Sequence, residues 1–199
     1  MLMLPQKRYS VIYADPPWSY GDKGFGKRPG DNTVKGSFAP EAGRYATMSL
    51  SEIKTLPVNR IALPDAALLL WATSPLLPEA FETIAAWGFK FKTVAFCWSK
   101  ITNSGKEVAN LGQWTMGNIE LCLLGTRGSP KRLDRTVRQL VTAERTEHSR
   151  KPEEVRRRIE TIFGDVPRIE LFSRISVPGW DAWGNEAPTQ DVGLCVSTG

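Results

Sequence analysis

Four consecutive residues, Asp15-Pro16-Pro17-Trp18, combine side chains that could do chemistry with a backbone that is held stiff. They follow an apolar run, residues 9–14, that predicts a short buried β-strand. The strand must end there, because proline supplies no N–H to a sheet and restricts the residue before it. We therefore expect a carboxylate, a turn of exposed carbonyls and an indole ring at the carboxyl end of a strand, where ligands bind in open α/β sheets.

These groups suit the activation of a weak amine nucleophile. The exocyclic nitrogen of adenine is one, because its lone pair is delocalised into the ring. The Asp15 carboxylate and the Pro16 carbonyl could each accept one of its N–H groups and so localise the lone pair, while Trp18 could stack on the base. The alternative is a proline-stiffened turn with a solvated aspartate and a packed tryptophan, since short motifs also occur without function.

Five further blocks follow the first along the chain. They are Tyr45-Ala46-Thr47-Met48-Ser49, Asn118-Ile119-Glu120, Ser149-Arg150-Lys151-Pro152, residues 168–174 and residues 179–185. With these blocks in this order, from residue 9 to about residue 186, the chain resembles the MT-A70 family of S-adenosylmethionine-dependent adenine-N6 methyltransferases. The resemblance implies that Asp15, Pro16, Pro17 and Trp18 carry catalysis.

The resemblance also implies that S-adenosylmethionine is the cofactor. In the family, the positions matching Arg174 and Asn185 bind its nucleoside part, and the position matching Lys151 holds its methionine carboxylate. Lys151 also precedes an expected helix N-terminus, where an anionic group is favoured; the alternative is one more basic surface residue. Glu170 could bind ribose hydroxyls or be a strand residue without a ligand. The expected cofactor-binding residues are Asp15, Lys151, Glu170, Arg174, Asn185 and Glu186. The chain departs from the family pattern at Ser176 and Glu186.

The net charge of +5 is concentrated between residues 127 and 158, which hold eleven Lys or Arg against five Asp or Glu. Such a segment is a candidate for phosphate contacts, and the alternative is a solvated helix face and a loop. We expect loops that contact the substrate at residues 19–44, 101–115 and 127–150. The individual residues expected to bind the substrate are Trp18, Tyr45, Lys27, Arg28, Arg132 and Arg135.

The composition excludes several classes of protein. A hydrophobic content of 41% and a charged content of 24% are typical of a soluble globular protein, and no apolar run is long enough to span a membrane. Three cysteines far apart indicate buried thiols in a reducing cytosol, and a single histidine argues against a zinc site. We therefore expect a cytoplasmic protein with no metal and no membrane partner, and the resemblance implies a bacterial or phage-encoded one.

The elements that must position these residues alternate between strands and helices. We expect strands at residues 9–14, 66–73, 89–98, 119–125 and 168–174. We expect helices at residues 78–87 and 152–163, and a short one that begins at a Ser49–Glu52 capping box and ends before Pro57. This alternation predicts one α/β domain over residues 1–199, with a doubly wound, mostly parallel sheet and a flexible tail at residues 188–199. The resemblance refines the fold to the class I (Rossmann-like) methyltransferase type in permuted order, with the catalytic strand first and the cofactor strand last.

The nature of the substrate depends on analogy. A compact single-domain chain is similar to the DNA-modifying members of the family in bacteria and phages, so we expect DNA. RNA adenine methylation would use the same chemistry and is the alternative. A non-catalytic nucleic-acid-binding subunit and an enzyme acting on a small molecule also stay open, as do a homodimer and a heterodimer.

Overall fold

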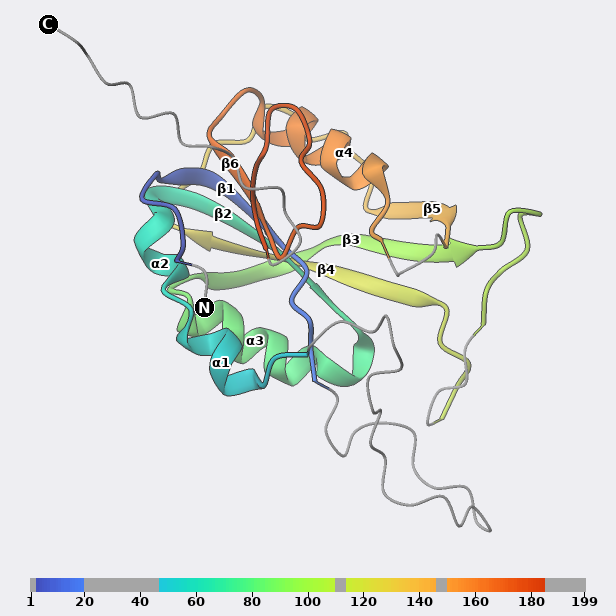
Figure 1. Ribbon diagram of the computed structural model, residues 1–199. Coiled ribbons are helices and arrows are strands. Elements are labelled where there is room, and N and C mark those ends of the chain that lie inside the picture. Colours follow the sequence, from blue (N-terminus) through green and yellow to red (C-terminus); the bar gives the residue numbers. More distant parts are fainter. Residues whose placement is uncertain (1–2, 20–46, 110–113, 146–149, 185–199) are drawn as a thin grey trace, which may run out of the picture.

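The computed structural model of the chain describes residues 3–19, 47–109, 114–145 and 150–184. Its described strands form one seven-stranded sheet in the order β5-β3-β4-β2-β1-β6-β7 (Figure 1). The strands are β1 (Tyr9–Ala14), β2 (Ala62–Ala72), β3 (Lys90–Ile101), β4 (Ile119–Arg127), β5 (Leu140–Glu144), β6 (Arg168–Leu171) and β7 (Asp181–Trp183). The helices are α1 (Leu50–Thr55), α2 (Val58–Ile61), α3 (Leu77–Ala86) and α4 (Glu153–Phe163), with one 3₁₀ turn, η2 (Ser74–Leu76).

The sheet is mixed, with a single reversed strand. β1 is parallel to both of its neighbours, β2 and β6, and the pairs β3–β5 and β6–β7 are also parallel. β4 runs antiparallel to both β2 and β3, so it is the one described strand that points the other way. The prediction of an α/β fold with a mostly parallel sheet is confirmed, although the sequence patterns did not reveal the reversal of β4.

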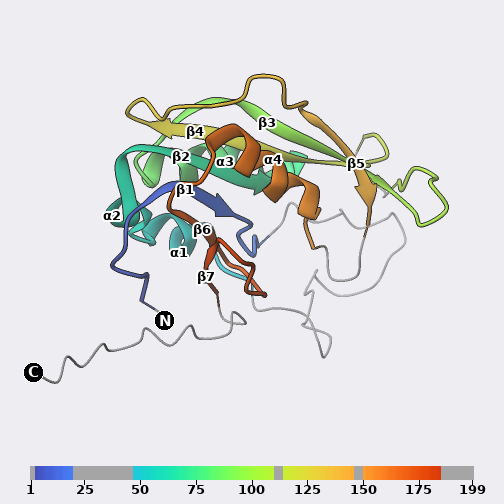
Figure 2. The same cartoon turned by 90° about the horizontal axis from the view of Figure 1, so that it is seen from above.

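Helices cover both faces of the sheet, with α4 on one side and α1, α2 and α3 on the other (Figure 1). Residues of β1 alternate between the two resulting cores. Ile12 and Ala14 pack in the core that contains α1 and α3, whereas Val11 and Tyr13 pack in the core beneath α4. A strand buried on both faces has apolar residues along most of its length, which is why the sequence of residues 9–14 clearly predicts a strand. Figure 2 shows α4 between β5 and β7, which lie at opposite edges of the sheet.

Local signals set the two helix ends that matter most for the site. α1 begins with the expected capping box, because the Ser49 N–H donates to Glu52 Oε2 (2.7 Å) and the Glu52 N–H donates to Ser49 Oγ (3.2 Å). α4 begins after Pro152 and buries Val155, Ile159 and Phe163 on one face. It stops at Gly164, whose φ of +73° suits glycine.

Four elements were not predicted: α2, η2, β5 and β7. β5 lies inside residues 127–150, which we expected to be a loop, so that prediction is wrong for residues 140–144. The expected strand at residues 168–174 ends at Leu171, and it is not the last strand because β7 follows. Both missed strands are short edge strands with little apolar alternation, so pairing with a neighbour defines them more than their own sequence does.

No helix in the described part of the chain is long and apolar enough to cross a membrane. Cys97 and Cys122 are free thiols, and burial raises the pKa of both. Cys195 lies outside the described residues, as does the expected tail at residues 188–199.

Candidate active site

A pocket of about 160 Å³ opens at the carboxyl ends of β1 and β2. Asp15, Pro16 and Trp18 line it from the end of β1, and residues 71–73 line it from the end of β2. Glu120, near the start of β4, and Lys151, just before α4, complete the lining. Because β4 is antiparallel, its amino end meets the carboxyl ends of its neighbours at this edge of the sheet. Three of the four residues of the first motif, Asp15, Pro16 and Trp18, therefore line a pocket at this edge of the sheet.

Hydrogen bonds fix the turn after β1. The Trp18 N–H donates to the Pro16 carbonyl (2.8 Å), and the Met48 N–H donates to the Pro17 carbonyl (2.9 Å). The Trp18 indole N–H donates to the carbonyl of Trp71 (3.0 Å), and the Trp18 side chain is buried in the core. The indole is thus both a packed side chain and a wall of the pocket. A carbonyl oxygen has two lone pairs, so Pro16 keeps the capacity to accept a second hydrogen bond.

Four charged side chains of alternating sign join at the pocket. Lys151 Nζ lies 2.8 Å from Asp15 Oδ2 and 3.1 Å from Glu120 Oε2. The other Glu120 oxygen, Oε1, pairs with Lys100 from the end of β3. The side chain of Asp15 is 35% exposed, whereas that of Lys151 is 9% exposed, so Asp15 is the most exposed of the four although most of its side chain is buried. Lys151 also lies over the Trp71 ring, 5.5 Å from its centroid.

Burial and pairing shift the acidities of these groups in different directions. Burial raises the pKa of Asp15 above its ordinary value, although Lys151 and Arg174 act against this. Burial would also raise the pKa of Glu120, but Lys151 and Lys100 outweigh it and hold that pKa below its ordinary value. The two carboxylates in turn raise the pKa of Lys151 in spite of its burial. Lys151 and Glu120 are therefore charged at neutral pH, and Asp15 is the carboxyl group that protonates more readily.

Arg174 lies at the same edge as Asp15, because it follows β6, which is the parallel neighbour of β1; its positive charge lowers the pKa of Asp15. The chain reaches it through a sharp turn in which Phe172 has a φ of +62°. The Ser173 N–H donates to the Trp183 carbonyl (3.1 Å), which ties this turn to the end of β7. A Cβ on Gly184 would lie 2.3 Å from the Ser173 carbonyl oxygen, so the two segments approach as closely as they do only because residue 184 is glycine.

Glu170 has a different environment from the one its predicted cofactor contact requires. Arg156 Nε donates to Glu170 Oε2 (2.7 Å) and Arg156 Nη2 donates to Glu170 Oε1 (2.9 Å). Both side chains are buried, and Glu170 is not among the residues that line the pocket. The pair joins β6 to α4, which gives Glu170 a part in packing.

Arg132 and Arg135 are exposed and the structure does not bring them to the pocket. They follow β4, whose carboxyl end lies at the opposite edge of the sheet from Asp15 because the strand is reversed. Their neighbour Leu133 donates its N–H to the Ile162 carbonyl, at the carboxyl end of α4, whereas Lys151 precedes the amino end of that helix. α4 has 11 residues, which at 1.5 Å per residue separates the two ends by about 16 Å.

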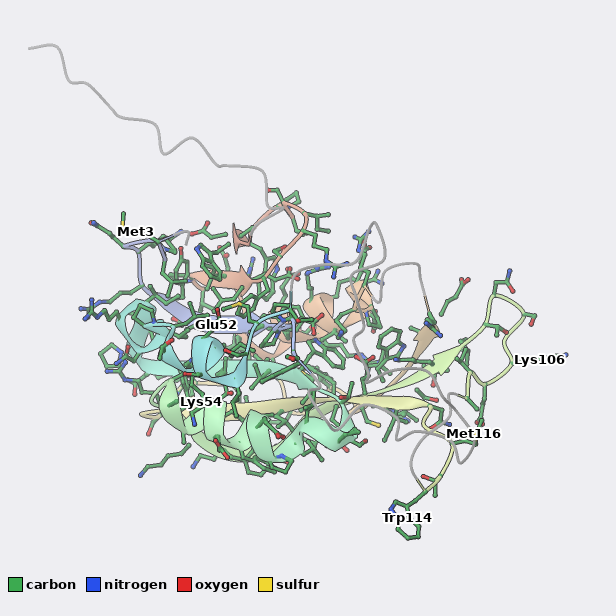
Figure 3. All side chains as sticks on the ribbon, turned by 60° about the horizontal axis from the view of Figure 1, so that its bottom comes forward. Met3, Glu52, Lys54, Lys106, Trp114 and Met116 are labelled. Atoms are coloured by element: carbon green, nitrogen blue, oxygen red, sulfur yellow. The ribbon has the colours of Figure 1, made fainter. Side chains whose placement is uncertain are left out.

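Five predicted site residues lie outside the described residues, so the structure does not place them. They are Lys27, Arg28, Tyr45, Asn185 and Glu186. Of the loop expected at residues 101–115, the described part projects from the ends of β3 and β4, and Figure 3 shows Lys106, Trp114 and Met116 on this projection. Trp114 is 96% exposed there.

Sequence reasoning missed Glu120, Lys100 and Trp71 as parts of the site. In the sequence, Glu120 stands out only as the last residue of the block Asn118-Ile119-Glu120, to which no individual role is assigned. A signal existed, since Glu120 is a charged residue near the start of an otherwise apolar strand, and such a residue is seldom buried without a partner. Among the described residues, no group of three or more His, Cys, Asp or Glu is arranged to hold a metal ion.

Comparison with known proteins gives consistent matches. The family model MT-A70 matches residues 9–186. The chain is 38% identical over 197 residues to the Type II methyltransferase M.MunI of Mycoplasma sp, covering 95% of this chain and 82% of that protein. It is 28% identical to an N(6)-adenosine-methyltransferase MT-A70-like protein of Arabidopsis thaliana, covering 89% of this chain and 24% of that protein. It is 29% identical to the N(6)-adenine-specific methyltransferase METTL4 of Homo sapiens, covering 91% of this chain and 38% of that protein.

Proposed function

The chain belongs to the MT-A70 family of adenine-N6 methyltransferases, and we propose that it transfers a methyl group from S-adenosylmethionine to N6 of adenine in DNA. The observation that carries this proposal is the pocket itself. It joins the Asp15-Pro16-Pro17-Trp18 turn to a buried lysine and a second carboxylate at the carboxyl end of the sheet.

The charges around the pocket suit the proposed cofactor. The amino-acid part of S-adenosylmethionine carries one carboxylate and one ammonium group, and the pocket offers the Lys151 ammonium beside the partly exposed carboxylate of Asp15. We assign the cofactor carboxylate to Lys151. Arg174, with Asn185 and Glu186 beyond the described residues, would hold the nucleoside part. When bound, the cofactor supplies an electrophilic methyl group.

The residues at the end of β1 would prepare the adenine. Asp15 accepts one N–H of the exocyclic amine, and the Pro16 carbonyl accepts the other through its remaining lone pair, so the lone pair of N6 is turned out of the ring. Trp18 bounds the pocket and holds the base in plane, with Tyr45 as a proposed second ring. Such positioning contributes up to roughly 7–11 kcal/mol in favourable cases. The amine becomes acidic once it carries the methyl group, and Asp15, whose pKa burial raises, can then take its proton.

We also propose the permuted class I order for the fold. Support comes from the pairing of β1 with β6, which are parallel neighbours with Tyr13 opposite Glu170 and Ala14 opposite Leu171. The carboxyl ends of the first strand and of the late strand therefore adjoin, which would put the turn that activates the base beside the turn that leads to Arg174. Residues 1–199 would form one domain, with substrate contacts from residues 19–44 and 101–115.

The choice of DNA over RNA is supported by chain organisation. The chain spans 82% of the Mycoplasma Type II methyltransferase but only 24% of the plant N(6)-adenosine-methyltransferase. The similarity to a bacterial protein also supports a place in the bacterial cytoplasm. RNA is the second candidate, because the chemistry at the amine would be the same.

The test is transfer of labelled methyl from S-adenosylmethionine to matched oligonucleotides of duplex DNA, single-stranded DNA and single-stranded RNA. The modified nucleoside is then identified by mass spectrometry. We expect N6-methyldeoxyadenosine from DNA. Modification of RNA alone would contradict the assignment of the substrate, and oligonucleotide binding without any methylated product would indicate a non-catalytic subunit.

A further inference from the structure

Lys100 does not line the pocket, but it pairs with Glu120, which does, and neither residue has a part in the methyl transfer described above. Lys100 lies near the end of β3 and Glu120 near the start of β4, where the strands pair with Trp98 opposite Glu120. Their side chains are 11% and 9% exposed, and they form an ion pair. Lys100 also lies over the Trp98 ring, 5.1 Å from its centroid.

A buried ion pair is weak evidence of stabilisation, because removing two charges from water costs about as much as their attraction returns. What distinguishes this pair is that Glu120 contacts a second cation, Lys151, which itself contacts Asp15. The series Lys100, Glu120, Lys151, Asp15 contains two positive and two negative charges, and Arg174 adds a positive charge near Asp15.

The charge around Glu120 depends on Lys100. Without it, Glu120 would be left with Lys151 as its one ion-pair partner among the described residues, and Lys151 also pairs with Asp15. Lys151 would then have to satisfy Asp15 and Glu120 while also binding a third carboxylate, that of the cofactor. With Lys100 in place, Glu120 has a cation of its own, and the attraction between Glu120 and Lys151 competes less with the cofactor.

We propose that Lys100 is a positioning residue, which neutralises Glu120 so that the Lys151 ammonium can bind the carboxylate of the amino-acid part of the cofactor. This inference rests on the proposed function, which assigns that carboxylate to Lys151. The lowered pKa of Glu120 supports it, because an ionised Glu120 is what makes the neutralisation necessary. The other charged groups in the network are Asp15, which raises the pKa of Lys151, and Arg174, which lowers that of Asp15.

The experiment measures binding of two ligands by calorimetry, without turnover. S-adenosylhomocysteine retains the amino-acid carboxylate, and 5′-methylthioadenosine lacks it. We expect Lys100→Met to weaken binding of S-adenosylhomocysteine about tenfold, the equivalent of one pKa unit of interaction, and to leave binding of 5′-methylthioadenosine unchanged. Lys100→Arg should restore wild-type binding. The matched control is Lys92→Met, an exposed lysine at the other end of the same strand.

A second pair of variants separates charge balance from folding. Glu120→Gln removes one of the two negative charges that pair with Lys151, so this variant should bind S-adenosylhomocysteine at least as tightly as the wild type. This measurement is informative even if Lys100→Met does not fold. The double variant Lys100→Met with Glu120→Gln should recover the affinity that Lys100→Met loses. A merely structural role would instead weaken both ligands together and make the double variant no better than the single one.

Three results would overturn the inference alone while leaving the proposed cofactor intact. These are equal loss of both ligands in Lys100→Met, unchanged binding of S-adenosylhomocysteine in that variant, and weakened binding of this ligand in Glu120→Gln. Failure of the wild-type protein to bind either ligand would overturn the proposed function and this inference with it.

Discussion

Asp15 is the residue whose environment is most closely matched to its proposed task. Its backbone is held by the turn that follows β1, and its carboxylate contacts Lys151 while remaining partly open to solvent. Burial makes it a better proton acceptor than an ordinary aspartate, and it has to be ionised to accept an N–H from adenine.

This gives a prediction for the pH dependence of methyl transfer. Because the pKa of Asp15 is raised, protonation of Asp15 should stop the reaction at a higher pH than the ordinary range of an aspartate. The rate should be constant at neutral pH and fall as pH drops through that raised pKa. The measurement is the single-turnover rate at saturating cofactor as a function of pH, with circular dichroism as the control for folding. An acid limb confined to the pH range of unfolding would contradict the prediction.

Gly184 shows how a residue without a side chain can shape the site. A Cβ there would lie 2.3 Å from the Ser173 carbonyl oxygen. Because the nearest atoms belong to the backbone, no side chain can move to relieve the clash. We expect Gly184→Ala to separate the ends of β6 and β7 and to lower both the melting temperature and the affinity for S-adenosylhomocysteine. Gly105→Ala is the control for backbone strain without a clash, because nothing lies within 4 Å of a Cβ there but its φ of +79° disfavours a side chain; it should lower the melting temperature and leave the affinity for S-adenosylhomocysteine unchanged. Equal effects of the two substitutions would rule out the close approach as the cause.

At the scale of elements, the pair between Arg156 and Glu170 fastens α4 to β6. Removing one partner of a buried ion pair costs about 3–5 kcal/mol. We expect Glu170→Ala to lower the free energy of unfolding by about that amount and to leave the affinity for S-adenosylhomocysteine unchanged. Denaturant unfolding and calorimetry measure the two quantities.

The matched control is Arg157→Ala on the same helix. Arg157 pairs with Glu154 at the surface, with side chains 72% and 42% exposed, and should contribute almost nothing. Loss of cofactor affinity in a folded Glu170→Ala protein would show instead that Glu170 is a ligand, as the sequence led us to expect.

The elements with local signals could be predicted from the sequence. β1 is a continuous apolar run stopped by two prolines, and α1 and α4 carry their own caps. β5 and β7 could not be predicted, because pairing along an edge defines them. The same dependence on strand pairing explains which site residues could be predicted. Asp15 was found because it belongs to a compact motif, whereas Lys100 and Glu120 meet only through the antiparallel pairing of β3 and β4.

At the scale of the molecule, the reversal of β4 decides at which edge of the sheet the basic residues that follow it lie. The basic residues that follow this strand emerge at the edge of the sheet away from the pocket, although the sequence places them between a site motif and Lys151. Proximity in sequence was therefore a poor guide to proximity in space for Arg132 and Arg135.

A length series of DNA duplexes tests this arrangement. The separation of about 16 Å along α4 corresponds to about five base pairs at 3.4 Å each. We expect the double variant Arg132→Ala with Arg135→Ala to bind a short duplex, with about four base pairs on each side of the target adenine, as tightly as the wild type. Equal weakening for short and long duplexes would show that the two arginines contact phosphates beside the target.

The rate of a single methyl transfer by Asp15→Asn shows whether the Asp15 carboxylate activates the amine. This variant keeps the size of the side chain and removes its charge. With cofactor and duplex DNA both saturating, we expect the rate to fall at least about a hundredfold, while calorimetry shows that S-adenosylhomocysteine still binds and circular dichroism shows an intact fold. A rate within a few-fold of the wild type would contradict the account, because the amine would then be activated without the Asp15 carboxylate.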